Sequence, residues 1–249
     1  DKKKNKGSYK RFYRSYDINK GELVATLESN YDSIKSYHTI LKELTIMEKL
    51  KDSKNNLTYI DFDIYRQNRR SFFVMHTELY DEDLSERLKR YMSHSDKVKI
   101  AYQAANSVDE LHKKNIIHRD IKERNFLVTN KNGKLKLVLI DYGLSKDFVE
   151  NEETFGIAGT RGYIDPYICK KRHGLHSHEN LQKSYYLKKN SDIFSLGVVL
   201  HQIFYPEEKE IYETVYRMNL HVLPKIGSPR MYKLKDFLSY HNSLEKMTE

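Results

Sequence analysis

The chain has 249 residues, of which 39% are hydrophobic and 12% aromatic, so it carries enough apolar material for a folded core and is not intrinsically disordered. Charged residues make up 32% of the chain, and the formal net charge is +9. The positive charge is spread, with small clusters at Lys2–Lys4 and Lys170–Arg172. Such a spread is more typical of a solvated surface or of an acidic partner than of a nucleic-acid groove.

The single cysteine, Cys169, excludes an internal disulfide framework and suits a reducing compartment. No apolar run reaches the length of a membrane span, and no signal-peptide pattern opens the chain. These features predict an intracellular, cytoplasmic location. The abrupt start and end of the sequence suggest a fragment of something longer, and the oligomeric state is left open.

Residues 1–79 predict a small β-rich unit with one helix. Its strands are expected at residues 9–16, 22–28, 57–65 and 71–78. The first two flank a turn, where Asn19, Lys20 and Gly21 favour chain reversal. Residues 33–50 place apolar side chains at three- and four-residue spacing, which indicates an amphipathic helix.

Residues 80–249 predict a larger, mainly helical unit. We expect its first helix to open at Asp83 and Leu84. A long amphipathic pattern covers residues 96–114, with Asp96 as the expected cap. Further helices are expected at residues 191–200, 207–219 and 231–246.

The most informative stretch lies at residues 116–143. Two isoleucines lead into His118-Arg119-Asp120, and Lys122 and Asn125 follow two and five residues after the aspartate. Two apolar runs separated by a turn then end in Asp141-Tyr142-Gly143. Phosphoryl transfer uses these residue types: a carboxylate that orients the acceptor hydroxyl, a lysine near the transferring phosphate, and amide and carboxylate ligands for magnesium.

These motifs resemble the catalytic loop and the magnesium motif of eukaryotic protein kinases. Residues 191–200 likewise resemble the buried helix at the centre of the kinase large lobe, in which Asp192 would hold the catalytic-loop backbone. The resemblance implies a bilobal α+β fold, with a β-rich N-lobe that includes helix C at 1–79 and a helical C-lobe at 80–249. On this spacing, we expect the final helices of a full kinase domain to be short or missing.

The resemblance also implies roles for individual residues. Asp120 would be the catalytic acid–base or hydroxyl-orienting carboxylate, and Asn125 and Asp141 would hold Mg²⁺. Lys122 is typical of serine/threonine kinases. ATP would bind between the lobes, and the adenine-site residues would be Phe12, Ala25, the gatekeeper Thr77, Glu78 and Tyr80 in the hinge, and Leu127 as the floor.

Two aromatic residues are expected to meet behind the catalytic loop. His118 and Tyr142 would stack in the interior, and Met47 would pack toward Tyr142. Tyrosine replaces the phenylalanine usual in kinases at this place. Its hydroxyl therefore needs a hydrogen-bond partner inside the protein.

The nucleotide loop and the third strand depart from the kinase pattern. Gly7 is the one loop glycine that remains, and Leu27 stands where the phosphate-binding lysine belongs. Strand side chains alternate between faces, so Lys10 should share the inward face with Phe12. This arrangement resembles that of with-no-lysine kinases. The spacing of that family is also matched by Gly7-Ser8-Tyr9-Lys10, Tyr13, Asp17 and Val24-Ala25.

Two interpretations of Lys10 stay open. In the first, Lys10 contacts the ATP phosphates and pairs with Glu43, which lies where the helix C acid should be. In the second, Lys10 is one surface lysine among many, Glu43 is a solvated helix residue, and the site is degenerate.

Residues 144–166 are expected to form the activation segment. It ends in Asp165-Pro166-Tyr167 instead of the usual Ala-Pro-Glu. Arg119 precedes the catalytic aspartate, and such an arginine often pairs with a phosphate on this segment. Thr154 is the preferred acceptor, with Ser145 second, and the alternative is that neither is modified.

Residues 168–190 form a long, basic, histidine-rich connection. Cys169, His173, His176 and His178 fit no common zinc spacing, so an interaction insert is favoured over a metal site.

The sequence thus favours an active serine/threonine-type protein kinase that uses ATP and Mg²⁺ and acts on a protein substrate or signalling partner. The alternative is a pseudokinase, a nucleotide-binding or allosteric module that has lost transfer; Leu27 and the missing glycines favour it, and intact Asp120, Asn125 and Asp141 oppose it. Nucleic-acid binding through the basic surface is a third and weaker hypothesis.

Overall fold

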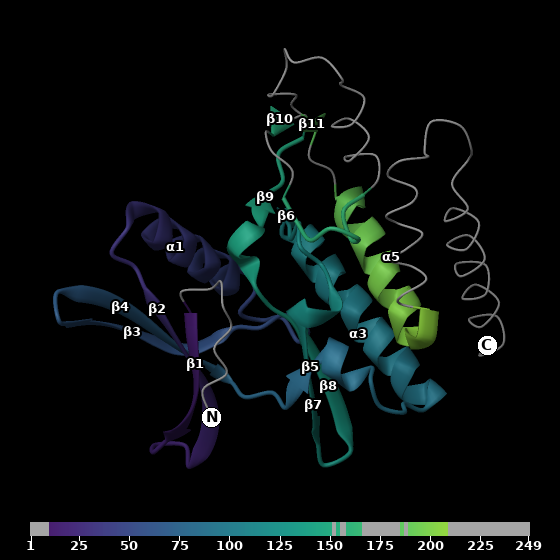
Figure 1. Cartoon of the computed structure of the whole chain (residues 1–249), viewed down its shortest axis with the longest axis horizontal. Helices are drawn as coiled ribbons and strands as arrows, with labels where there is room; N and C mark the ends of the chain where they lie inside the picture. The colour runs from purple at the N-terminus through teal and green to yellow at the C-terminus, as the bar shows by residue number, and fades with distance from the viewer. Residues whose placement is uncertain (1–9, 151–152, 155–157, 166–184, 187–188, 209–249) are drawn as a thin grey trace.

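The computed structural model describes residues 10–150, 153–154, 158–165, 185–186 and 189–208 (Figure 1). The loop around Gly7, the histidine-rich connection with Cys169, and the helices expected at 207–219 and 231–246 lie outside these ranges or almost entirely so.

The N-terminal part is a four-stranded antiparallel sheet. Its strands are β1 (Lys10–Asp17), β2 (Glu22–Asn30), β3 (Tyr59–Gln67) and β4 (Arg70–Glu78), in the order β1-β2-β4-β3. The turn after β1 is closed by a hydrogen bond of 2.8 Å from the Gly21 N–H to the Asp17 carbonyl. Gly21 adopts φ +68°, a conformation that favours glycine.

One face of this sheet carries α1 (Ile34–Lys49) (Figure 1). The helix begins at Ser33, whose side chain accepts from the Ser36 N–H while the Ser36 hydroxyl accepts from the Ser33 N–H, a reciprocal capping box. Its buried side includes Ile46 and Met47, which belong to one apolar core with Phe73 of β4. The expected helix at 33–50 is therefore confirmed.

Strand β3 begins two residues later than expected. The Leu57 N–H donates to the Leu139 carbonyl at 2.9 Å, and the Leu139 N–H donates to the Asn55 carbonyl at 2.9 Å. Residues 55–57 therefore bond to the end of another strand, and β3 starts at Tyr59. This link also joins the N-terminal sheet to the C-terminal part.

The C-terminal part contains the helices and a second, smaller sheet. Its elements up to the catalytic loop are β5 (Glu82–Asp83), α2 (Leu84–Arg87), α3 (His94–Lys113) and β6 (Ile116–Ile117). Those that follow are η1 (Glu123–Asn125), β7 (Phe126–Lys131), β8 (Lys134–Leu139), η2 (Tyr142–Leu144), β9 (Lys146–Asp147), β10 (Glu153–Thr154), β11 (Tyr185–Tyr186), α5 (Asn190–Phe204) and η3 (Pro206–Glu208).

Two long helices, α3 and α5, pack against each other beneath the catalytic loop (Figure 1). The expectation that Asp96 caps α3 is wrong: the helix begins one turn earlier, and the Ser93 hydroxyl accepts from the Asp96 N–H at 3.1 Å. Asp83 does cap α2, by accepting from the Glu86 N–H. The α+β class predicted from the sequence is confirmed, and no helix in the described ranges is long and apolar enough to cross a membrane.

Candidate active site

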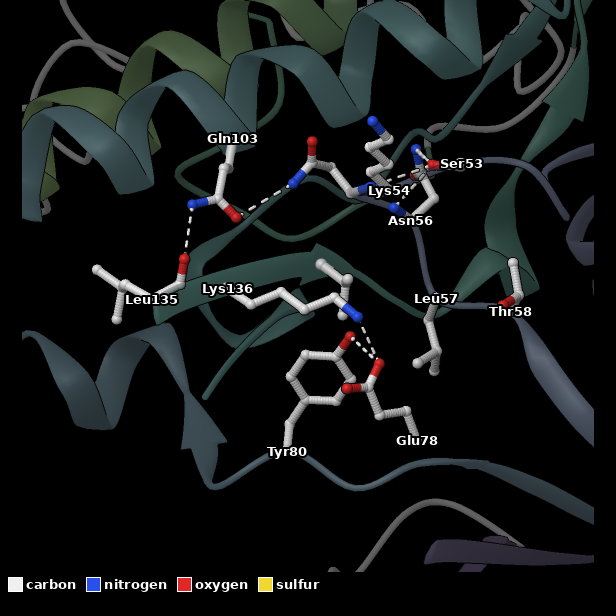
Figure 2. Close-up of a pocket in the computed structure, with 12 residues that line it drawn as sticks. Ser53, Lys54, Asn56, Leu57, Thr58, Glu78, Tyr80, Gln103, Leu135 and Lys136 are labelled. Carbon is white, nitrogen blue, oxygen red and sulfur yellow. Dashed lines mark hydrogen bonds and ion pairs between the residues drawn. The ribbon is translucent and has the colours of Figure 1, made fainter. Parts of the chain in front are cut away.

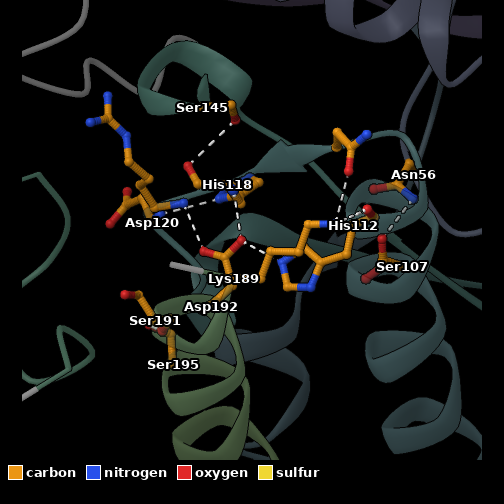
Figure 3. A network of polar contacts seen from close by, with 12 residues as sticks. Asn56, Ser107, His112, His118, Asp120, Ser145, Lys189, Ser191, Asp192 and Ser195 are labelled. Atoms are coloured by element: carbon orange, nitrogen blue, oxygen red, sulfur yellow. Dashed lines mark hydrogen bonds and ion pairs between the residues drawn. The ribbon is translucent and has the colours of Figure 1, made fainter. Parts of the chain in front are cut away.

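The backbone of the catalytic loop is held by one buried carboxylate. Asp192, near the start of α5, accepts from the His118 N–H at 2.7 Å and from the Arg119 N–H at 2.9 Å (Figure 3). The ring Nε2 of His112 lies 3.0 Å from the same carboxylate. Arg119 adopts φ +69°, a left-handed conformation that costs energy for a non-glycine residue and that these bonds help to hold. The role expected for Asp192 is confirmed.

Both carboxylate oxygens of Asp120 receive hydrogen bonds. Lys122 Nζ lies 2.6 Å from Oδ2, and the Thr160 hydroxyl donates to Oδ1 at 2.6 Å. The Lys122 ammonium also donates to the Thr160 hydroxyl at 2.8 Å. Asp120, Lys122 and Thr160 thus form a closed triangle, with the Asp120 side chain only slightly exposed.

Thr160 is the site residue that sequence reasoning missed. It lies 40 residues after Asp120, in a segment without helix or strand spacing. The signal in the sequence was the preceding glycine. Gly159 adopts φ +116°, and a Cβ there would lie 2.6 Å from the Arg119 carbonyl oxygen.

Asn125 connects the loop to the strand that precedes Asp141. Its Nδ2 donates to the Asp120 carbonyl at 2.8 Å and to Asp120 Oδ2 at 3.2 Å, which leaves Oδ1 as an acceptor with no donor among the residues that the structure describes. The Ile140 N–H donates to the Asn125 carbonyl at 2.8 Å. Asp141 is exposed and left-handed, at φ +67°, and caps η2 through the Gly143 N–H.

This donor set fits a magnesium ion that shares ligands with ATP. Magnesium prefers oxygen ligands, and it is usually bound by one or two carboxylates together with substrate phosphates and water. The Asp141 carboxylate and Asn125 Oδ1 are donors of this kind. The described residues contain no group of three or more His, Cys, Asp or Glu side chains that would hold a metal ion by themselves.

Tyr142 is fully buried and meets His118 as expected, but edge to face. The two ring centroids lie 5.8 Å apart with an interplanar angle of 69°, so the expected interior contact between the rings is made in a T-shaped geometry. Edge-to-face contact is favoured because the ring edge is positive and the ring face negative. The Tyr142 hydroxyl finds its partner in the Leu139 carbonyl at 2.9 Å, and burial raises the pKa of this phenol.

Glu43 is buried, with 7% of its surface exposed, so its interpretation as a solvated helix residue is wrong. Its Oε1 lies 3.0 Å from the position that a Cβ on Gly143 would occupy. Helix α1 therefore brings this carboxylate against the Asp-Tyr-Gly motif. Met47, one turn later, belongs to the same apolar core as Tyr142, as expected.

A basic cluster lies beside this junction. Lys42 of α1 is half-buried, and burial together with the nearby Arg119 guanidinium holds the pKa of its ammonium below the usual value. Lys146 of β9 adds a third positive charge, and Glu43 and Asp147 offset part of it. Arg119 also donates from Nε to the Leu144 carbonyl at 2.6 Å.

The candidate adenine site lies under the N-terminal sheet. Ala25 of β2 lies opposite Arg14 of β1 on one side and opposite Thr77 of β4 on the other, and both Ala25 and Thr77 are buried. Phe12 pairs with Leu27 on the same face and is 59% exposed. Leu127 is half-buried in the small sheet, paired with Val138 and Asp83.

The position of Lys10 follows from the same register. Its backbone pairs with Ser29, two residues beyond the pair of Phe12 and Leu27, so position 10 belongs to the strand face that carries Ala25. The predicted parity of positions 10, 12, 25 and 27 is therefore borne out by the backbone. The structure does not describe where the Lys10 side chain lies.

The side chains of the hinge point away from the adenine face. Glu78 follows Thr77 and so lies on the opposite face, where its carboxylate meets Lys136 at 2.5 Å and the Tyr80 hydroxyl at 3.0 Å (Figure 2). Lys131 lies 3.3 Å from the same carboxylate. Glu78, Tyr80 and Lys136 line a cavity of about 570 Å³. The contact of Glu78 and Tyr80 with adenine therefore stays a prediction, and it concerns their backbone, because their side chains face this cavity.

Two candidate phosphorylation sites lie on the expected activation segment. Ser145 is fully buried, and its hydroxyl donates to the His118 carbonyl at 3.4 Å (Figure 3), so this hydroxyl is not accessible to a kinase in this conformation. Thr154 lies in β10, whose backbone pairs with Tyr185 of β11.

The fold and the site together define a protein-kinase-like molecule. The structure is similar to a chain in the crystal structure of the yeast RNA Pol II CTD kinase CTDK-1 complex, with a TM-score of 0.60 and 22% sequence identity over 78% of this chain and 58% of that one. This similarity shows the fold. The chain belongs to the protein kinase family, because the family model for the protein kinase domain matches residues 4–243.

Relatives include serine/threonine kinases. A probable serine/threonine-protein kinase of Dictyostelium discoideum is 41% identical over 107 residues, which cover 43% of this chain and 7% of the relative. The leaf rust 10 disease-resistance locus receptor-like protein kinase-like 1.4 of Arabidopsis thaliana is 29% identical over 90% of this chain and 33% of the relative. Calcium-dependent protein kinase 5 of Plasmodium berghei is 25% identical over 79% of this chain and 32% of the relative. The chain therefore spans a third or less of each relative.

Proposed function

We propose that this chain is a serine/threonine-type protein kinase domain that transfers the terminal phosphate of ATP to a protein hydroxyl. The observation that carries the proposal is the triangle of Asp120, Lys122 and Thr160, because it places a charged lysine and a carboxylate around one acceptor position. The proposed lobes are residues 1–79 and 80–249, with ATP between them.

Each site residue has a separate role in the proposed phosphoryl transfer. Asp120 accepts a hydrogen bond from the acceptor hydroxyl and orients it toward the phosphate, and Lys122 stabilises the negative charge of the transferring group. Asn125 and Asp141 hold Mg²⁺, which when bound neutralises charge on the ATP phosphates. Ala25, Phe12, Thr77 and Leu127 enclose the adenine, and the backbone of Glu78 and Tyr80 pairs with its edge.

Lys10 takes the role of the missing lysine in this proposal. Leu27 cannot contact a phosphate by charge, whereas position 10 lies on the same strand face two residues from Phe12. The position of Glu43 supports it further, because this buried carboxylate of α1 lies against Gly143, where the helix C acid is expected. Lys10 would then contact the ATP phosphates and pair with Glu43, and Gly7 is the nucleotide-loop glycine expected to contact ATP.

A phosphate on Thr154 would regulate the same site. Lys42, Arg119 and Lys146 gather positive charge beside the activation segment, and a phosphate dianion would offset their mutual repulsion.

The decisive experiment measures ATP- and Mg²⁺-dependent autophosphorylation of the purified chain. Lys10→Met and Asp141→Asn should both abolish it, whereas Lys20→Met, which removes an exposed lysine from the turn of the same hairpin, should not. Full activity in Lys10→Met would reject the relocated lysine.

The alternative, a pseudokinase that binds nucleotide or a partner without transfer, is favoured by Leu27, by the missing loop glycines and by Asp165-Pro166-Tyr167 in place of the usual Ala-Pro-Glu. A parent chain without transfer, even with manganese, would support it. Protection by ATP against thermal unfolding, measured with and without Mg²⁺, then separates a nucleotide-binding pseudokinase from an empty one.

A further inference from the structure

Arg124 is the outward-pointing residue of the catalytic-loop turn η1. Its neighbours Glu123 and Asn125 are both buried, whereas Arg124 is exposed. Asn125 is fixed by its bonds to Asp120, and Glu123 accepts from the Tyr163 hydroxyl. Within the described ranges Arg124 has no hydrogen-bond or ion-pair partner, so its guanidinium faces solvent beside the catalytic residues.

Arg161 occupies a matching position on the activation segment. It directly follows Thr160, whose hydroxyl bonds to Asp120, and it precedes Gly162, which adopts φ +100°. Arg161 is exposed and has no partner among the residues that the structure describes. Consecutive Cα atoms are about 3.8 Å apart, so each arginine is anchored within one residue of a side chain that touches Asp120.

Four carboxylates, on the catalytic loop, at the start of α2 and on α5, already make other contacts. Glu123 is buried under Tyr163, and Asp192 is occupied by the loop backbone. At the start of α2, Glu82 pairs with Arg90, and Asp83 caps the helix. None of these four carboxylates is placed to neutralise Arg124 or Arg161.

An acceptor hydroxyl must come within hydrogen-bond distance of Asp120. The peptide that carries it then passes close to η1 on one side and to residues 160–162 on the other. Its flanking side chains meet two unpaired guanidiniums, which bind carboxylates in a two-pronged geometry.

From these contacts we infer that the acceptor site selects protein segments with Asp or Glu flanking the phosphorylated hydroxyl, through Arg124 and Arg161. The inference rests on the proposed kinase function and names its substrate class. Both arginines determine specificity and neither takes part in the transfer itself.

The test uses three synthetic peptides that differ only in the residues on both sides of one serine: Glu, Gln or Lys. The parent chain should give the highest kcat/KM on the Glu peptide. Arg124→Ala and Arg161→Ala should each lower that value roughly 3- to 10-fold, as expected for a partly exposed charge pair, and leave the Gln peptide unchanged. Arg124→Glu should favour the Lys peptide.

The control is Arg66→Ala, which removes an exposed arginine from β3 of the N-terminal sheet and should change none of the three values. Equal kcat/KM for the Glu and Gln peptides in the parent chain would overturn the inference. An unchanged preference in the double variant Arg124→Ala, Arg161→Ala would do the same.

Peptide binding separates this inference from the proposed function. Fluorescence anisotropy of the three labelled peptides, with a non-hydrolysable ATP analogue present, requires no transfer. If the parent chain binds the Glu peptide most tightly and the double variant loses this preference, the inference is supported even when autophosphorylation is absent. In that case only the proposed catalysis fails. Equal binding of all three peptides overturns the inference whatever the activity.

Discussion

The hydroxyl of Thr160 donates a hydrogen bond to the carboxylate of Asp120, with 2.6 Å between Oγ1 and Oδ1. Lys122 bonds to both groups, so two hydrogen bonds of Thr160 fix the activation segment to the catalytic loop, and the bond between Lys122 and Asp120 closes the triangle. A displaced segment would release Asp120 and Lys122 to other rotamers. The triangle therefore couples the shape of the acceptor site to the state of the activation segment.

Removing the Thr160 hydroxyl should lower transfer without unfolding the chain. Thr160→Val keeps the shape of the side chain but loses the bond to a charged group, which is worth about 1.5–3 kcal/mol, so kcat should fall roughly 10- to 100-fold. Thr160→Ser keeps the hydroxyl and should retain most of the activity. Peptide phosphorylation and thermal denaturation measure the two effects, and a fully active Thr160→Val would contradict the coupling.

A side chain at Gly159 should disrupt the same contact. The Cβ of Gly159→Ala would lie 2.6 Å from the Arg119 carbonyl oxygen, which is backbone and cannot turn aside. We expect transfer to be lost and the melting temperature to fall. Gly133→Ala is the matched control, because Gly133 also has a positive φ, +76°, but nothing lies within 4 Å of its Cβ position. That control should cost about 1–2 kcal/mol of stability and keep the activity.

Tyr142→Phe should be a mild change, although the hydroxyl is fully buried. The Leu139 carbonyl that accepts from Tyr142 also accepts from the Leu57 N–H at 2.9 Å, so it keeps a partner. Loss of one neutral hydrogen bond should therefore lower the free energy of unfolding by about 1 kcal/mol. Tyr142→Leu also removes the edge-to-face contact with His118 and should cost clearly more. Urea denaturation compares the two variants, and equal losses would contradict the role given to the ring.

Asp192→Ala should be among the most damaging single changes outside the catalytic residues. It leaves the buried N–H groups of His118 and Arg119 without an acceptor, and each such group costs about 1–3 kcal/mol. Because Arg119 is held at φ +69°, the loop should relax and transfer should be lost. Asp109→Ala serves as the control: its ion pair with Lys113 on the surface of α3 should contribute less than about 1 kcal/mol. Chemical denaturation with an activity assay would measure both, and similar small losses in the two variants would refute the anchoring role.

Much of the fold could be read from local patterns. The helix at 33–50 and the long helix that includes 96–114 followed from apolar spacing of three and four residues, because that spacing gathers side chains on one helix face. The shared face of positions 10, 12, 25 and 27 followed from the period of two along a strand. The motif around Asp120 gave the kinase family because its residue types and spacing are rarely found together.

The remaining features depend on which segments meet in space. Local spacing predicted that α3 begins at Asp96. In the structure the Ser93 side chain accepts from the Asp96 N–H, so the helix begins after Ser93. Local spacing also did not decide whether Glu43 is buried or solvated. The side chain is buried because α1 packs close to Gly143.

The sequence by itself determined the family and the candidate catalytic carboxylate, because Asp120, Lys122 and Asn125 lie close together along the chain in a pattern typical of kinases. Only the tertiary structure showed that Thr160 completes their hydrogen bonds, which brings Arg161 near them, and that Arg124 is exposed between two buried neighbours. The physical reason is that a contact between residues 40 apart leaves no periodic trace in either segment. It arises when the fold, held here by Asp192, brings the two segments together.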